Sequence, residues 1–185
     1  VIKKGRITNI DKVAVIGAGG GLGIHMLKML KMYNIDCIAL ETKTIKEKAC
    51  KEAGANLFLS TTSNNIIETI QDYTKTYGLD VVVDFVSSKA SLELGVSILG
   101  KGGRLITLGG SGEPFVADSG KMLLKELELI GSRYCTKQEV LDSLELVARK
   151  LITPLVTEKV SPLEANELHN KIEMGTVIGR AGIIF

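Results

Sequence analysis

Val13-Ala14-Val15-Ile16-Gly17-Ala18-Gly19-Gly20-Gly21-Leu22-Gly23 is the stretch that decides the fold. Its apolar run is short enough for one strand and predicts a strand over Lys12 to Ile16, buried on both faces. Five glycines follow and lead directly into a helical pattern that starts at Leu22. A strand, a glycine-rich turn and a helix in this order are typical of a unit that binds the phosphates of a dinucleotide.

The rest of the chain alternates between strand and helix patterns as far as residue 108, which predicts a parallel sheet with helices on both faces. Further strands are expected at 35–40, 56–59, 80–86 and 104–108, with a turn at 100–103. We therefore expect an α/β fold, a doubly wound parallel sheet (Rossmann fold), as a single domain over 1–185. Beyond residue 110 we expect short helices near 119–125 and 162–174, strands at 127–132 and 181–185, and an amphipathic helix with Val140, Leu141, Leu144, Val147, Ala148 and Leu151 on its apolar side.

Composition excludes several function classes. The net charge of +2 is spread along 185 residues, and four Tyr, four Phe and no Trp leave few side chains for stacking on bases, so we expect no nucleic-acid partner. No apolar run has the length of a membrane span and no signal peptide opens the chain, so we expect a soluble, cytoplasmic protein without a membrane partner. Cys37, Cys50 and Cys135 are far apart and are expected to be reduced thiols rather than metal ligands.

The glycine loop and one acid predict how a cofactor would bind. Backbone amides of Gly20, Gly21 and Leu22 lie where the helix begins, and they are expected to donate to a pyrophosphate. Glu41 ends the second predicted strand about 20 residues later, the position of the acid that binds the adenosine ribose, and this favours NAD over NADP. Lys46 could brace that carboxylate or the ribose, whereas Lys43 is the residue that would tolerate a 2′-phosphate.

Motifs spread over nearly the whole chain resemble the cofactor domain of the medium-chain dehydrogenase/reductase superfamily, which includes the zinc-dependent alcohol dehydrogenases. The matching segments beyond the glycine loop and Glu41 are Glu52-Ala53-Gly54-Ala55, Val81 to Val86, Lys101 to Arg104, Leu108 to Gly110, Ile130 to Ser132, Leu163 to Asn166 and Gly179 to Ala181.

The resemblance implies a set of cofactor contacts. Phosphates would be held by the loop residues, the adenosine ribose by the acid and the lysine, the adenine side by two apolar residues, and the nicotinamide end by backbone groups. A lysine would replace the arginine with which the family reaches the pyrophosphate. The residues are, in this order, Gly19, Gly20, Gly21, Leu22 and Gly23; Glu41 and Lys46; Phe85 and Val86; Leu108, Gly109 and Gly110; and Lys137.

The same resemblance implies hydride transfer between nicotinamide and an alcohol/carbonyl substrate, a small molecule. The zinc ligands and the catalytic residues are expected in an N-terminal domain preceding Val1, so this chain alone would bind cofactor without turnover. Two alternatives stay open: a zinc-free quinone or enoyl reductase using NADPH, and a non-enzymatic nucleotide-sensing module. The edge strand at 127–132 predicts a homodimer or a higher homo-oligomer.

The remaining polar residues have simpler interpretations. We expect His25 to pack at the surface or between domains and His169 to be partly buried on its helix. Asp84 is expected to be tied into the hydrogen bonding of the fold, and Ser87 or Ser88 to cap the following helix.

Overall fold

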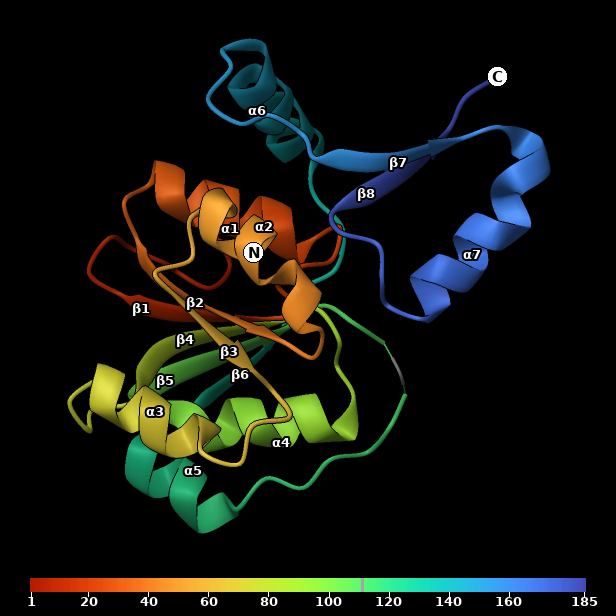
Figure 1. Cartoon of the computed structure of the whole chain (residues 1–185). Coiled ribbons are helices and arrows are strands. Elements are labelled where there is room, and N and C mark those ends of the chain that lie inside the picture. Colours follow the sequence, from red (N-terminus) through yellow and green to blue (C-terminus); the bar gives the residue numbers. More distant parts are fainter. Residues whose placement is uncertain (111) are drawn as a thin grey trace.

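The computed structural model describes residues 1–110 and 112–185, and it confirms the predicted doubly wound α/β fold (Figure 1). Six parallel strands form the main sheet in the order β3-β2-β1-β4-β5-β6. They span Lys12–Ile16 (β1), Asp36–Glu41 (β2), Leu57–Ser60 (β3), Leu79–Asp84 (β4), Leu99–Thr107 (β5) and Glu128–Gly131 (β6). The helices between them are α1 (Gly23–Met32), η1 (Thr44–Lys46), α2 (Glu47–Ala53), α3 (Ile66–Tyr73), α4 (Lys89–Ile98) and α5 (Ser119–Lys125).

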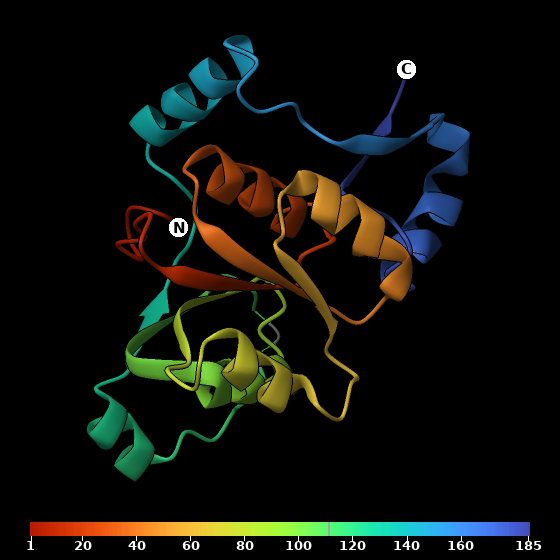
Figure 2. The ribbon, with the colours of Figure 1, turned by 60° about the vertical axis from the view of Figure 1, so that its left-hand side comes forward.

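Helices cover both faces of the sheet, with α1 and α2 on one face and α3, α4 and α5 on the other (Figure 2). Each face has its own apolar cluster, one built around α1 and α2 and the other around α3 and α4. Val13, Ala14 and Val15 of β1 are fully buried, as are Val81, Val82 and Val83 of β4. Both strands are apolar without alternation because each is covered on both faces.

The last part of the chain leaves this sheet. It comprises α6 (Lys137–Ala148), β7 (Val156–Val160), η2 (Pro162–Glu164), α7 (Ala165–Glu173) and β8 (Arg180–Ile183). β7 and β8 pair in parallel as a separate two-stranded ribbon beside α1 and α7 (Figure 1). No strand was expected at β7, because the segment Val-Thr-Glu-Lys-Val has no clear alternation of apolar and polar residues. In the structure this strand is largely exposed.

Several predicted boundaries are wrong. Residues 100–103 do not form a turn before β5; they lie within it, and the register shifts where Leu79 pairs with Leu99 and Val81 with Arg104. His169 is exposed on α7, where Leu168 takes the buried position.

None of the helices in the described part of the chain has both the length and the apolar character that crossing a bilayer requires.

Candidate functional site

The loops that follow β1, β2, β4 and β5 meet at one edge of the sheet. All four strands are parallel, so their carboxyl ends face the same way, and β1 pairs with β2 on one side and β4 on the other. The connections from β1 and β4 go to opposite faces of the sheet, the arrangement at which open α/β sheets bind their ligands. The Phe85 N–H donates to the Ile16 carbonyl at 3.2 Å, which holds the two loops side by side.

Two glycines make the turn after β1 possible. Gly17 has φ +74°, a conformation that L side chains rarely adopt, and its N–H donates to the Leu40 carbonyl at 3.0 Å. A Cβ on Gly23 would stand 2.2 Å from the Gly17 carbonyl oxygen and 2.6 Å from the Ala18 Cα. The first turn of α1 therefore packs directly against the strand exit, and only glycine fits at 23.

Some backbone N–H groups of the glycine loop donate hydrogen bonds within the protein, and others have no acceptor there. Gly20 N–H donates to the Gly17 carbonyl at 3.2 Å in this loop conformation, and its expected role as a phosphate donor stays a prediction. The N–H groups of Gly21, Leu22 and Gly23 have no acceptor among residues 1–110 and 112–185. Leu22 is the N-cap and offers no side-chain cap. Three donors thus point out of the positive end of the α1 dipole.

Glu41 lies at the end of β2 as expected, but its carboxylate faces the loop rather than solvent. Oε2 accepts from the Gly19 N–H at 3.0 Å and Oε1 accepts from the Thr42 N–H at 2.9 Å. Lys46 Nζ lies 3.6 Å from Oε2, and both side chains are more than nine-tenths buried. This confirms that Lys46 braces the carboxylate.

The Glu41–Lys46 pair has two consequences for the site. It leaves no room for a side chain at position 19, because a Cβ there would stand 2.4 Å from Cδ of Lys46 and 3.1 Å from Oε2 of Glu41. It also places an ammonium beside the carboxylate, so the repulsion that Glu41 would exert on a 2′-phosphate would be partly offset.

The loops after β4 and β5 are joined through Asp84, which is fully buried. Oδ1 of Asp84 accepts from the N–H groups of Val86 and Ser87 at 2.8 and 3.0 Å, and Oδ2 accepts from Ser91 Oγ at 2.7 Å. The expectation that this acid is tied into the fold is confirmed. Ser88, not Ser87, caps α4.

The residues expected at the adenine and nicotinamide ends lie along the same edge. Val86 is 47% exposed, and a Cβ on Gly17 would approach its Cγ2 to 3.0 Å. Leu108 N–H donates to the Asp84 carbonyl, and Gly109 N–H donates to Ser87 Oγ at 2.9 Å. Gly110 is exposed, and a Cβ there would meet nothing within 4 Å.

Arg180 is a site residue that sequence reasoning missed. A Cβ on Gly21 would stand 2.6 Å from Nε and 2.8 Å from Cζ of Arg180, so the guanidinium lies directly against the loop. Gly179 N–H donates to the Gly19 carbonyl at 3.0 Å and fixes the start of β8 there. No periodicity or spacing joins position 180 to position 21. The only signal was the family-like segment Gly179 to Ala181, which carried no assigned role.

Lys137 is not brought to the loop by any described contact. It is the first residue of α6, whose first turns face the N-terminal segment: Asp142 accepts from Lys3 Nζ at 3.2 Å. The cation that the structure places on Gly21 comes from β8 instead.

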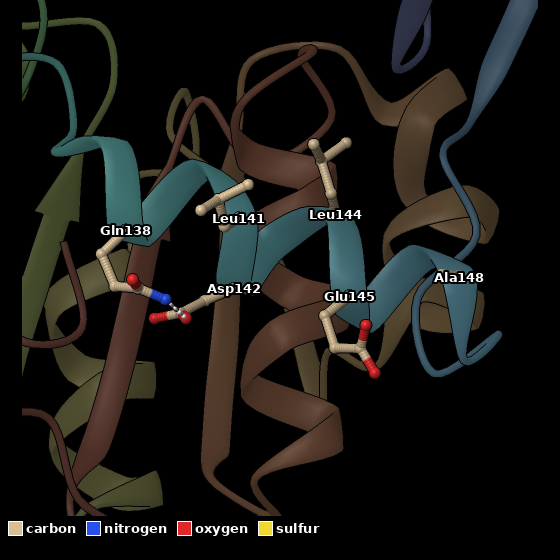
Figure 3. A pocket seen from close by; sticks show the side chains of 6 residues that line it. All are labelled: Gln138, Leu141, Asp142, Leu144, Glu145 and Ala148. Atoms are coloured by element: carbon tan, nitrogen blue, oxygen red, sulfur yellow. Dashed lines mark hydrogen bonds between the residues drawn. The ribbon is translucent and has the colours of Figure 1, made fainter.

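One hollow of the surface is lined by residues of α6 alone: Gln138, Leu141, Asp142, Leu144, Glu145 and Ala148 (Figure 3). A second hollow is lined by residues of η1 and α2: Thr44, Ile45, Glu47, Lys48, Lys51 and Glu52. Among the described residues no three His, Cys, Asp or Glu side chains are grouped as a metal site requires. The candidate site is the edge of the sheet where the loops after β1 and β4 meet, because the expected residues come together there.

Comparison with known proteins agrees with this geometry. The zinc-binding dehydrogenase family matches residues 21–149. The chain belongs to that family. An NAD-dependent alcohol dehydrogenase of Sulfurisphaera tokodaii is 26% identical over 184 residues, which are 99% of this chain and 53% of the relative. An acryloyl-coenzyme A reductase of the same organism is 26% identical over 180 residues, 96% of this chain and 52% of the relative.

Among solved structures, the alcohol dehydrogenase of the hyperthermophilic archaeon Aeropyrum pernix superposes with a TM-score of 0.89 at 28% identity. The match covers 97% of this chain and 52% of that enzyme. Members of this dehydrogenase family are thus similar to the whole of the chain, and the chain spans about half the length of the relatives it matches.

Proposed function

We propose that this chain binds NAD(H) along the carboxyl edge of its sheet and presents the nicotinamide for hydride transfer to or from an alcohol/carbonyl substrate in the longer enzyme. The proposal rests on one observation. Three N–H groups without an acceptor, those of Gly21, Leu22 and Gly23, lie next to the Arg180 guanidinium. Amide donors at a helix N-terminus and an arginine together suit a pyrophosphate.

Residues along the carboxyl edge of the sheet would bind the three parts of a dinucleotide in turn. The pyrophosphate would lie on the α1 N-terminus, and the adenosine would extend towards Glu41 and Val86. The nicotinamide would lie against the backbone of Leu108 to Gly110. The bound cofactor supplies the hydride chemistry, while these residues bind and orient it. Catalytic groups and any zinc would belong to a further domain, and the substrate would be a small molecule.

NAD(H) is the cofactor we propose, and the relative named NAD-dependent supports it. Glu41 supplies the negative charge that disfavours a 2′-phosphate, but its pairing with Lys46 weakens that discrimination. We therefore expect a preference for NADH over NADPH that is moderate, on the order of tenfold.

Titration of the chain with NADH and NADPH, followed by cofactor fluorescence, tests the proposal. Arg180→Gln is expected to weaken NADH binding about tenfold or more, because a charged contact to phosphate is lost. Glu41→Gln is expected to narrow the gap between the two cofactors. Lys159→Gln removes an exposed lysine of β7 and should change the affinity less than about twofold.

Three outcomes would contradict the proposal or part of it. Equal affinities for NADH and NADPH in the unaltered chain would refute the role of Glu41. If Lys137→Gln weakens NADH binding more than Arg180→Gln does, the pyrophosphate contact comes from Lys137 on α6 and not from Arg180. Absence of binding by either dinucleotide would refute the function itself.

A reductase acting on enoyl thioesters is a second candidate, supported by the relative named acryloyl-coenzyme A reductase. Turnover of the longer protein with an alcohol or with an enoyl thioester distinguishes the two.

We also propose a cytoplasmic homodimer, supported by the edge position of β6, where Leu129 is 42% exposed.

A further inference from the structure

His25 uses both of its ring nitrogens on backbone groups that lie far apart in the sequence. Its Nδ1 is 2.7 Å from the carbonyl oxygen of Gly21, and its Nε2 accepts from the N–H of Leu155 at 3.1 Å. An amide N–H can only donate, so Nε2 must carry a lone pair. The ring proton therefore resides on Nδ1 and is donated to Gly21. The two partners assign one neutral tautomer.

The contact with Leu155 continues to Arg180. The Leu155 carbonyl accepts from the Arg180 N–H at 2.9 Å, and the Arg180 side chain lies against Gly21. The connections thus form a closed circuit from Gly21 through His25, Leu155 and Arg180 back to Gly21. In Figure 1 this is where the β7–β8 ribbon approaches the start of α1.

We propose that His25 is a positioning residue for the pyrophosphate site. It binds the carbonyl of Gly21 on the inner side of the loop, while the N–H groups of Gly21, Leu22 and Gly23 stay available. Through Leu155 it holds the strand that delivers Arg180. The inference rests on the proposed function, because it assigns His25 to the binding of that cofactor's phosphates.

Only the neutral ring with hydrogen on Nδ1 can do this. An imidazolium would carry N–H on Nε2 as well and would oppose the N–H of Leu155 donor against donor. The charged side chains facing this connection are Lys28 on α1, whose Nζ donates to the Thr153 carbonyl at 2.7 Å, and Arg180 on β8. No carboxylate of the described residues forms an ion pair with the ring. The bridge therefore requires the neutral ring with hydrogen on Nδ1.

Binding of ADP-ribose and of adenosine separates a positioning role from a merely structural one, since only ADP-ribose has the pyrophosphate. His25→Ala is expected to weaken ADP-ribose binding about tenfold, the loss of one or two hydrogen bonds that order the site, and adenosine binding less than twofold. His25→Asn keeps an N–H near Gly21 but offers no acceptor to Leu155, so it should show an intermediate loss. It also serves if His25→Ala does not fold.

The chain has two histidines, so nuclear magnetic resonance of the ring nitrogens reads His25 directly without cofactor. The ring of His25 should show hydrogen on Nδ1 and a lone pair on Nε2. His169→Ala, at an exposed position on α7, should leave both this tautomer and the ADP-ribose affinity unchanged.

Equal losses for ADP-ribose and adenosine, no loss in either His25 variant, or hydrogen on Nε2 would overturn the inference. If the unaltered chain binds no dinucleotide, the proposed function fails and the role in binding fails with it. The ring resonances then still report whether the His25 bridge exists, so the two failures can be told apart.

Discussion

Helices α1 and α6 both carry apolar side chains at helical spacing, yet they are buried to very different degrees. α1 buries Ile24, Met26, Leu27 and Leu30 against the sheet, whereas no residue of α6 is buried. The contrast extends to the regions that contain them. Both apolar clusters consist of buried residues from 7 to 106, while residues 132–185 contribute three buried apolar side chains: Ile152, Leu168 and Val177.

This difference shows how the cofactor site is assembled. The sheet region builds its own core and provides the glycine loop with its N–H donors. The C-terminal region, residues 132–185, is joined to it by polar contacts at α1, the glycine loop and Lys3, and by Leu155, which packs against one apolar cluster. This region nevertheless provides Arg180. A site that depends on both regions is only as ordered as those contacts.

The largest expected effect compares the same substitution on the two helices. Leu27→Ala in α1 removes a side chain with no exposure, and it should lower the free energy of unfolding by about 3 kcal/mol. Leu144→Ala in α6 removes one that is 59% exposed, and it should cost less than about 0.5 kcal/mol. Urea unfolding measures both. Similar costs at the two positions would mean that α6 is covered in solution.

The two buried thiols, both in the sheet region, should make the free energy of unfolding depend on pH. Burial raises the pKa of Cys37 from 9.0 to about 11, and burial also raises the pKa of Cys50. Their folded-state pKa values are raised, so the stability they contribute is present below pH 9. It is lost as the pH rises towards 11, because the unfolded thiols ionise first.

Between pH 7 and pH 10.5, Cys37 alone should reduce the free energy of unfolding by about 2 kcal/mol, at about 1.4 kcal/mol per pKa unit. Cys37→Ala should reduce the loss by about half, because Cys50 still contributes in the same pH range, whereas Cys135→Ser, at an exposed position, should leave the pH profile as it is. Ellman's reagent should label one thiol rapidly in the folded chain. Rapid labelling of all three would contradict the buried placement.

The smallest effect concerns the contacts between the two regions. Lys28→Met removes the hydrogen bond to the Thr153 carbonyl, and it should raise amide hydrogen exchange in β7 and β8 about fivefold, an opening of about 1 kcal/mol. Exchange in β1 and β4 should not change. Lys51→Met, which removes an exposed ion pair within α2, is the matched control and should leave the ribbon unaffected. Faster exchange throughout the chain would show that the regions unfold together.

The sequence by itself determined the sheet region, because that information is local and periodic. Continuous apolar runs marked β1 and β4, glycines marked the turn after β1, and an acid was expected at the end of β2, as the structure confirms. Each signal depends on residues close together in the chain and on a fixed repeat.

Only the tertiary structure decided what these residues contact. It turned Glu41 inward onto Gly19 and Lys46, engaged Gly20 N–H within its own turn, and left α6 with its apolar side chains exposed. It also brought Arg180 and Leu155 to the glycine loop, across more than 120 residues of chain. Such contacts depend on which surfaces the folded sheet leaves adjacent, and no local pattern encodes them.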